Sequence, residues 1–250
     1  MEHSVVHGVW RDGRIRLQSW PNDDAVAHLV VVDQDTVPDR DELRSITTTA
    51  SSAGVRSIRS GAVFPRAADA LADAGFVTLD TLALLQLDLD RAGRLPRVRT
   101  RRLWRRQHDD AAAIDRAAFG DLWGNDAAGL VGIRRATPAN RARRIDRDHR
   151  VAAFSITGVA ARTAYLQRLA VHPAHQRHGL GRALVSDAIT WAQRRRFATM
   201  MVNTGVENAP ALALYDWFGF RLLRDQLTVA ELQLADDSAP THAAPAHRDR

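Results

Sequence analysis

The sequence predicts an α/β fold in which a mixed β-sheet is flanked by helices. Apolar runs of strand length alternate along the chain with amphipathic runs of helical length, and this alternation is typical of α/β sheets. A strand, helix and strand around residue 70 also recur around residue 215, so we expect two copies of one α/β unit. We therefore divide the chain into residues 1–93, residues 94–235 and a tail of residues 236–250.

The first segment, residues 1–93, alternates strands and helices. The apolar run AVAHLVVVD has the length and composition of a buried strand. Gly75 marks the end of a helix, because glycine commonly takes the left-handed conformation that follows the last turn. In chain order we predict a strand at 25–33, a helix at 40–53, a strand at 55–63, a helix at 65–74 and a strand region at 77–89.

The second segment, residues 94–235, continues this alternation. Asp109 is suited to begin a helix and Gly219 to end one. We predict strands at 97–104, 151–159, 164–171 and 198–203, helices at 109–119, 180–195 and 210–218, and final strands within 221–234. Residues 123–148 are strongly basic and are expected to be irregular or helical. Residues 236–250 are mostly Ala, Pro, His and charged residues, so we expect a disordered tail.

The composition excludes several classes of site. The chain has 250 residues, 45% hydrophobic and 26% charged, which is typical of a soluble globular protein. It has no Cys, so disulfides, thiolate nucleophiles and Cys-ligated metals are excluded. No apolar run approaches the ~18 residues of a membrane-spanning helix, and the N-terminus lacks the pattern of a secretory signal. We expect a cytoplasmic protein with no membrane partner.

The positive net charge of the chain favours an anionic binding partner. The net charge is +6, and all 35 basic residues are Arg because the chain contains no Lys. A basic surface can attract a phosphorylated cofactor or a nucleic acid. The basic stretch at 94–107 contains one aromatic residue, Trp104, and no named nucleic-acid-binding motif. We interpret it as a solvated face, do not expect a nucleic-acid partner, and expect that some of these Arg side chains could attract an acidic acceptor.

The strongest motif follows the strand at 164–171. Gln176, Gly179 and Gly181 form a QxxGxG turn that opens the helix at 180–195. The first backbone N–H groups of a helix have no partner within it, and the helix dipole is positive at that end. Such a turn can bind phosphate oxygens, and glycine lets the backbone approach the anion closely. The dinucleotide motif GxGxxG and the P-loop are both absent, the latter because it needs Lys.

This motif resembles the pyrophosphate-binding motif of the GNAT superfamily of N-acetyltransferases. The later segment VNTGVENAPALALYDWFGF, residues 202–220, is similar to the superfamily's "N…A…LY…GF" segment. The resemblance covers roughly residues 97–234, and its style is closest to the subgroup that includes protein N-terminal acetyltransferases. It implies a GNAT fold and transfer of an acetyl group from acetyl-CoA to a primary amine, with acetyl-CoA as cosubstrate.

The resemblance also implies roles for individual residues. Backbone groups of the strand that precedes the turn would pair with the pantetheine arm of acetyl-CoA, in a slot where this strand and the next one splay apart. The turn would hold the pyrophosphate, and Tyr215 would protonate the leaving thiolate. A backbone N–H near Val171 would stabilise the developing oxyanion. The implied cofactor-binding residues are Leu169, Ala170, Val171, Gln176, Arg177, His178, Gly179, Leu180, Gly181, Arg182 and Asn208.

Other interpretations of these residues stay open. Tyr215 could be a core aromatic residue, and Asn208 could cap a helix. Some family members use a carboxylate as base on the strand before the turn, but this chain has Gln167 there. Glu207 is the nearest carboxylate in the second motif and is the candidate base; a base acting through water, or an amine that arrives neutral, are the alternatives. His172, His175 and His178 are interpreted as solvated loop residues, and no metal is expected.

The repeat indicates how the N-terminal segment is related to the C-terminal one. Its glycine–phenylalanine pair aligns with the later one at an offset of 220 − 76 = 144 residues, and each pair is followed by what we expect to be two strands. Leu71 then stands where Tyr215 stands, and Phe64 where Asn208 stands. We predict a degenerate GNAT-like unit, similar to the tandem arrangement of mycothiol synthase, which covers the acceptor pocket or stabilises the active half.

The predicted function is therefore N-acetylation of an unidentified acceptor, either a protein N-terminus or a small molecule, by direct attack in a ternary complex. The alternative is a non-catalytic acyl-CoA-binding regulatory protein. A homodimer and a monomer are both compatible with the sequence.

Overall fold

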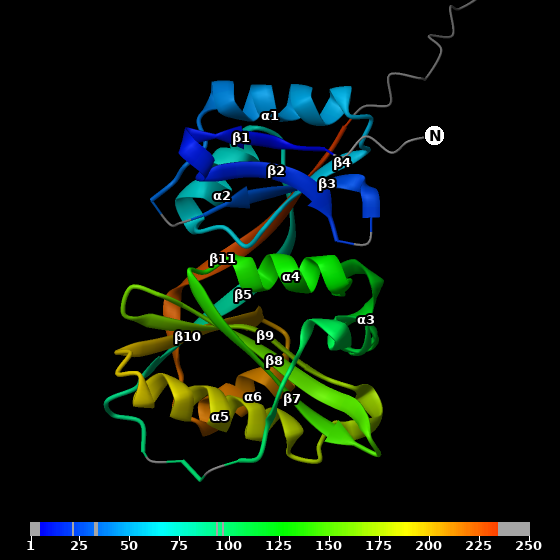
Figure 1. Cartoon of the computed structure of the whole chain (residues 1–250). Helices are drawn as coiled ribbons and strands as arrows, with labels where there is room; N and C mark the ends of the chain where they lie inside the picture. Colours follow the sequence, from blue (N-terminus) through cyan, green and yellow to red (C-terminus); the bar gives the residue numbers. More distant parts are fainter. Residues whose placement is uncertain (1–5, 22, 33–34, 94, 97, 235–250) are drawn as a thin grey trace, which may run out of the picture.

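The computed structural model describes residues 6–21, 23–32, 35–93, 95–96 and 98–234. Within this part of the chain, eleven strands form one sheet in the order β1-β2-β3-β4-β11-β5-β10-β9-β8-β7-β6 (Figure 1). The strands are β1 Gly8–Trp10, β2 Ile15–Trp20, β3 Asp23–Val31, β4 Ser57–Ser60, β5 Val77–Asp88, β6 Arg101–Arg102, β7 Ala139–Arg147, β8 Arg150–Ala160, β9 Thr163–Val171, β10 Thr199–Gly205 and β11 Arg221–Gln233. The predicted mixed α/β sheet is confirmed; the predicted disordered tail lies outside the described residues.

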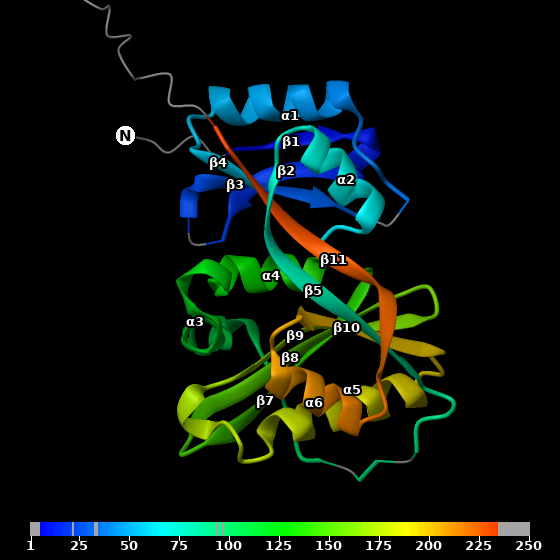
Figure 2. The same ribbon diagram turned by 180° about the vertical axis from the view of Figure 1, so that it is seen from behind.

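Helices cover the sheet in layers. They are α1 Arg40–Ser52, α2 Pro65–Asp73, α3 His108–Trp123, α4 Ala127–Arg135, α5 Leu180–Arg194 and α6 Ala209–Trp217. In the C-terminal part, α3 and α4 pack on one face of the sheet, and their core includes Leu103, Leu130 and Phe154. The opposite face carries α5 and α6, and their core includes Val185, Ile189 and Tyr215 (Figure 2).

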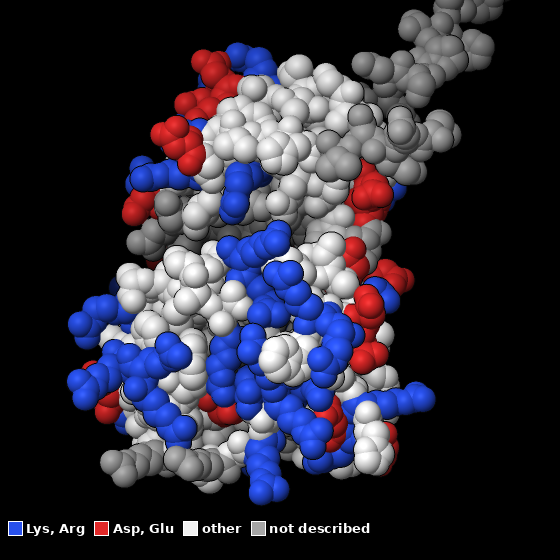
Figure 3. All heavy atoms as spheres, viewed as in Figure 1, with Lys and Arg blue, Asp and Glu red and all other residues white. Residues whose placement is uncertain are grey.

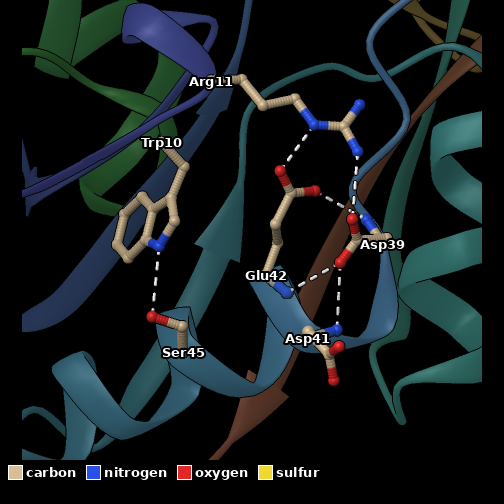
Figure 4. Close-up of polar contacts among 6 residues, drawn as sticks. All are labelled: Trp10, Arg11, Asp39, Asp41, Glu42 and Ser45. Carbon is tan, nitrogen blue, oxygen red and sulfur yellow. Dashed lines mark hydrogen bonds and ion pairs between the residues drawn. The ribbon is translucent and has the colours of Figure 1, made fainter.

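Helix α1 is fixed to the start of the chain at its first turn. The Asp39 side chain accepts a hydrogen bond from the Glu42 N–H at 2.9 Å, and the Glu42 carboxylate accepts one from the Asp39 N–H at 2.8 Å. This is a capping box, which satisfies backbone donors that the helix leaves unpaired. The Arg11 guanidinium pairs with both carboxylates, and the Trp10 indole donates to the Ser45 hydroxyl at 3.2 Å (Figure 4).

The long strands β5 and β11 join the two halves of the molecule. Strand β5 pairs antiparallel with both β10 and β11, whereas β11 pairs on its other side with β4. The last strand of each half therefore reaches into the sheet of the other half, and both views show the two strands crossing between them (Figures 1 and 2). Equivalent elements keep the predicted offset, since 209 − 65 = 144 for the helices and 221 − 77 = 144 for the strands.

Several predicted elements need correction. Each repeat ends in one long strand, so the predicted strand pairs are wrong; the neighbouring strand comes from the other half. The predicted strand at 97–104 shortens to β6, because only Arg101 and Arg102 pair with β7. Part of the stretch predicted to be irregular or helical is β7, which is fixed by antiparallel pairing with β8. Strands β1 and β2 were not predicted.

Within the residues that the structure describes, no helix combines the length and the apolar character needed to cross a membrane.

Candidate functional site

A cavity of about 510 Å³ opens at the N-terminus of α5. Its walls come from α3, β9, the turn before α5, and α6. Ten of the eleven predicted cofactor-binding residues line it: Leu169, Ala170, Val171, Gln176, Arg177, Gly179, Leu180, Gly181, Arg182 and Asn208. The eleventh, His178, does not. The structure adds five residues that the sequence did not predict: Ala118, Phe119, Pro210, Ala211 and Leu214.

The sheet is open beside this cavity. Strands β9 and β10 run parallel, but they pair over only three positions, and the last pair joins Tyr165 to Met201. Beyond that pair, β9 continues to Val171 without β10 at its side. The two strands therefore splay apart and leave one edge of β9 unpaired next to the cavity.

The free edge of β9 presents the backbone groups of Leu169 and Val171. On the opposite edge, β9 pairs antiparallel with β8, and the His172 N–H donates to the Ala152 carbonyl at 2.9 Å. Successive residues of a strand direct their backbone groups to alternate edges. Leu169 and Val171 therefore direct theirs to the open edge, where an extended ligand can pair like an added strand.

The turn before α5 exposes a row of backbone donors. Among the hydrogen bonds of the described residues, none is donated by the N–H groups from Arg177 to Arg182; the first helical bond runs from the Ala183 N–H to the Gly179 carbonyl at 2.9 Å. Gly179 is the N-cap of α5 and has φ of 78°, a left-handed conformation that suits glycine. Free N–H groups at the positive end of a helix dipole form an anion-binding site.

Side chains around the turn add charge and hold its shape. The Gln176 side-chain amide donates to the Val171 carbonyl at 3.3 Å, which ties the turn to the end of β9. The Arg182 guanidinium lies over the Trp217 ring, 4.3 Å from its centroid. Gly181 lies close to α6, since a Cβ there would be 3.4 Å from Leu214. The His178 ring contacts the Gln176 carbonyl at 2.8 Å, so His178 supports the turn from outside the cavity.

The amides, the splayed strands and the arginines fit the parts of acetyl-CoA. Six free amides with Arg177 and Arg182 suit a diphosphate, and the open edge of β9 suits the amide-containing pantetheine arm.

Asn208 caps α6 and also lines the cavity. Its Oδ1 accepts from the Ala211 N–H at 3.2 Å, and its Nδ2 donates to the Thr204 hydroxyl at 3.1 Å. The capping interpretation is therefore confirmed, and the same side chain lies where a ligand in the cavity would meet it.

Tyr215 is buried next to the cavity and does not line it. Its ring lies 5.5 Å from that of Phe220, in an apolar cluster that includes the cavity residues Leu169, Ala211 and Leu214. Burial raises the pKa of the Tyr215 phenol above its usual value of 10.0. The phenol therefore stays protonated at neutral pH and can act as a proton donor, but not as a base.

No carboxylate lines the cavity within the described residues. Glu207 is exposed on the turn between β10 and α6, outside the cavity. Gln167 is the extra residue of a β-bulge in β9, because Ile156 pairs with Arg168 and Thr157 with Leu166. Its amide donates to the Ile133 carbonyl at 3.0 Å, and its Oε1 is buried without a partner.

The histidines near the turn do not form a metal site. His172 accepts a hydrogen bond from the Ala174 N–H at 3.2 Å, and its ring lies 5.8 Å from that of His175. Across residues 6–234, apart from the few positions left undescribed, no three His, Asp or Glu side chains are placed to hold a metal ion.

Comparisons with known proteins agree with this geometry. The sequence model described as "Acetyltransferase (GNAT) family" matches residues 84–220, more than half of the chain. The "[Ribosomal protein bS18]-alanine N-acetyltransferase" of Escherichia coli strain K12 is 44% identical over 71 residues, which are 28% of this chain and 48% of the relative. "N-alpha-acetyltransferase 30" of Saccharomyces cerevisiae is 41% identical over 56 residues, 22% of this chain and 32% of the relative. The aligned region thus spans about half or less of the length of these relatives.

Solved structures share the fold over nearly the whole chain. A GCN5-related N-acetyltransferase from Kribbella flavida matches with a TM-score of 0.61 and 17% identity, covering 91% of this chain and 89% of that one. A tandem GNAT protein from the clavulanic acid biosynthesis pathway matches with the same TM-score and 16% identity, covering 91% and 82%. At these identities the likeness shows the fold alone, and it includes the N-terminal part.

Proposed function

The chain belongs to the acetyltransferase (GNAT) family, and we propose that it transfers an acetyl group from acetyl-CoA to a primary amine, with both substrates bound together. One observation carries this proposal: six consecutive backbone amides at the head of α5 have no acceptor among the described residues, and five of the six residues line a cavity beside splayed strands. That combination suits a diphosphate joined to an extended amide-containing arm.

In this proposal, the binding residues act as three groups. The N–H groups from Arg177 to Arg182 hold the pyrophosphate, and the Arg177 and Arg182 guanidinium groups add charge. Leu169 pairs with the pantetheine arm through its backbone N–H and carbonyl, whereas Val171 contributes only its N–H because its carbonyl accepts from the Gln176 side chain. The Val171 N–H lies at the end of this edge, where it can stabilise negative charge that develops on a carbonyl oxygen.

Bound acetyl-CoA supplies a thioester, whose carbonyl carbon accepts the amine and whose sulfur leaves with a proton. Tyr215 is the proposed donor of that proton, because its phenol is protonated at neutral pH, and the proton that the amine loses on forming the amide restores the phenol through water. Its hydroxyl has no hydrogen-bond partner among the described residues, so no protein acceptor competes for the proton. Tyr215 packs in the same apolar cluster as the cavity residue Leu214, so its role requires the side chains of α6 to let its hydroxyl reach the bound sulfur.

No carboxylate in the described cavity wall is placed to take a proton from the acceptor amine, so the amine's own pKa matters. An α-amino group has a pKa of about 7.7–8.0, so about a quarter or more of it is neutral at pH 7.5; a lysine amine with a pKa of about 10.4 is almost entirely charged. We infer that the acceptor is a protein N-terminal α-amine, which needs little help to lose its proton. The names of the two relatives above support this choice, and Glu207, through water, is the competing base.

The N-terminal residues have a structural part in this proposal. We propose that residues 1–93 are a degenerate GNAT-like unit whose strand β5 completes the sheet of an active unit at 94–235. Leu71, at the position equivalent to Tyr215, is fully buried and carries no reactive group.

The test uses the purified chain, acetyl-CoA and short peptides that differ at the N-terminal residue, with alanine included. We expect free CoA thiol to appear together with a peptide whose mass increases by one acetyl group. A peptide with a blocked N-terminus and a free lysine is the control and should react far more slowly. Reaction of the lysine peptide alone would contradict the choice of acceptor.

A non-catalytic acyl-CoA-binding protein is the second candidate, and one observation favours it: Tyr215 does not line the cavity. It predicts heat of binding with acetyl-CoA in calorimetry and no thiol release with any amine. An absence of binding heat would contradict both candidates.

A further inference from the structure

Arginine side chains gather on one face of the C-terminal half, over α4 and β7, with few acidic side chains among them (Figure 3). They come from two parts of the sequence: β6 with the 3-10 turn Arg105–Gln107 that follows it, and the last turn of α4 about 30 residues later. We name this patch the arginine surface and define it as Arg101, Arg102, Trp104, Arg105, Arg106 and Arg134. The sequence favoured a solvated face for residues 94–107, but it did not place α4 beside them.

The charges of the arginine surface are largely uncompensated. Arg102, Arg105, Arg106 and Arg134 form no ion pair with any described residue. The pKa of Arg134 is lowered, first by burial and then by the positive charges of Arg102 and Arg105. Cross-strand neighbours also carry like charges, since Arg102 pairs with Arg143 and Arg101 with Arg144. Folding has therefore concentrated positive charge here. The Arg134 guanidinium contacts two neutral partners, Asn140 Oδ1 at 3.0 Å and His108 Nε2 at 3.2 Å, so its charge stays available to an anionic ligand.

Trp104 lies among the arginine side chains of this surface. Its side chain is partly solvent-exposed, with 44% of the residue accessible. The Arg102 guanidinium lies over its ring, 4.1 Å from the centroid, and that of Arg106 is 5.9 Å away. Exposed aromatic rings and stacked guanidinium planes are surfaces on which unpaired bases stack, while neighbouring arginines hold the phosphates.

The arginine surface is separate from the proposed acetyl-CoA site. No residue that defines it lines the cavity at α5. It is continuous instead with a second cavity of about 580 Å³, whose wall includes Arg99, Arg101 and Arg144. That wall also contains Asp110 and Asp146, so the charge is less positive there than around Trp104.

We propose that the arginine surface binds a single-stranded polynucleotide, by stacking of bases on the Trp104–Arg102 pair and by contacts of phosphates with Arg105, Arg106 and Arg134. An acidic peptide would use the charges and would have no use for the exposed indole. A duplex keeps its bases stacked inside the helix and would also leave the indole unused. This inference does not depend on the proposed acetyltransferase activity.

The test is fluorescence anisotropy with labelled oligouridylate and oligothymidylate of about 12 nucleotides, with a matching duplex and an oligoglutamate peptide as competitors. For the three phosphate contacts proposed on a single strand, affinity should fall about 20-fold between about 50 and about 200 mM salt. Trp104→Ala should weaken binding about tenfold, as expected for the loss of one stacked base. The triple variant Arg102→Gln, Arg105→Gln, Arg106→Gln should lose nearly all binding.

The matched control is the triple variant Arg66→Gln, Arg221→Gln, Arg224→Gln, which removes the same charge from exposed positions outside the surface. Calorimetry with acetyl-CoA and circular dichroism check that each variant is folded. Binding of either oligonucleotide supports the proposal. The ratio of the two affinities then shows whether the surface prefers RNA, prefers DNA or binds both equally. The proposal is overturned if the control weakens binding as much, if Trp104→Ala has no effect, or if the duplex or oligoglutamate binds more tightly.

Discussion

Arg59 and Glu231 form an ion pair of 2.8 Å that links β4 of the N-terminal half to β11 of the C-terminal half. Both side chains are nearly buried, with exposed fractions of 9% and 16%. The Glu231 carboxylate also accepts from the Ser57 hydroxyl at 2.9 Å, and the Arg59 guanidinium lies over the Trp20 ring. The contact therefore fixes the C-terminal strand of the chain in the N-terminal sheet.

Glu231→Gln should lower the free energy of unfolding by about 3 kcal/mol, because it leaves the nearly buried guanidinium of Arg59 without its counter-charge. The measurement is urea unfolding followed by circular dichroism. Asp41→Asn is the matched control: its partner Arg44 is exposed, and loss of such a surface pair costs under about 1 kcal/mol. Equal losses of unfolding free energy in the two variants would show that the Arg59–Glu231 pair stabilises the fold no more than an exposed ion pair does.

A fragment of residues 94–250 should not fold alone. It lacks β4 and β5, so β11 would lose the partners on both of its sides, and β10 would lose the partner along its β5-facing edge; unpaired sheet edges would be exposed. A fragment that begins at residue 76 keeps β5 and should be more soluble, although β11 still lacks β4. Amide proton NMR spectra of both fragments make this comparison. A well-dispersed spectrum from residues 94–250 would contradict the role that we assign to the strand exchange.

Local sequence patterns predict where strands and helices lie better than they predict which strands pair with one another. Residues 77–89 were predicted to be strand-like, and β5 spans Val77–Asp88. Its pairing with β10 could not be predicted, because alternation of side chains specifies faces of a strand and says nothing of its neighbour. Strand β7 was missed because ANRARRIDR has little apolar content; only Ala142 and Ile145 are buried, and pairing with β8 decides its conformation.

The candidate site likewise contains residues that the sequence predicted and residues that only the folded structure brings to it. The turn at Gly179 and Gly181 is a local feature, so its motif is visible in the sequence and its residues do line one cavity. Ala118 and Phe119 lie about 50 or more positions before the turn and reach the cavity only because α3 packs on β9. Burial of Tyr215 in the apolar cluster between α6 and the sheet is likewise a result of packing, which no motif records.

Gly179→Ala should weaken acetyl-CoA binding about fivefold and lower the free energy of unfolding by about 1 kcal/mol. The reason is the backbone: φ of 78° disfavours any residue with a Cβ, and relief of that strain would turn the free amides away from the anion. Gly132→Ala is the control, because Gly132 lies in α4 with open space around it. That change should stabilise α4 by about 0.5–1 kcal/mol and leave binding unchanged. Calorimetry and thermal unfolding measure both effects.

His28 should make the protein less stable as the pH falls. Burial, with the nearby charges of Arg59 and Arg16, lowers the pKa of His28 from 6.5 to about 4. Between these values the unfolded chain binds a proton that the folded chain does not, so stability is lost from pH 6.5 downward. Allowing for the partial exposure of the ring, the loss should be about 1–2 kcal/mol at pH 4.

His28→Gln should therefore flatten the dependence of unfolding free energy on pH between 6.5 and 4. The control is His7→Gln, at an exposed position. Urea unfolding at a series of pH values gives the slopes, and a slope that His28→Gln leaves unchanged would show that another group is responsible.

Tyr215→Phe should separate catalysis from binding. If the phenol protonates the leaving sulfur, kcat should fall about 100-fold or more, while the dissociation constant of acetyl-CoA stays the same. Stability should change little, since the hydroxyl has no hydrogen-bond partner among the described residues and the ring keeps its packing against Phe220. Tyr165→Phe, at the other tyrosine of the chain, is the control and should retain full kcat. An unchanged kcat in Tyr215→Phe would assign Tyr215 to the core alone, and the proton of the thiol would then come from water.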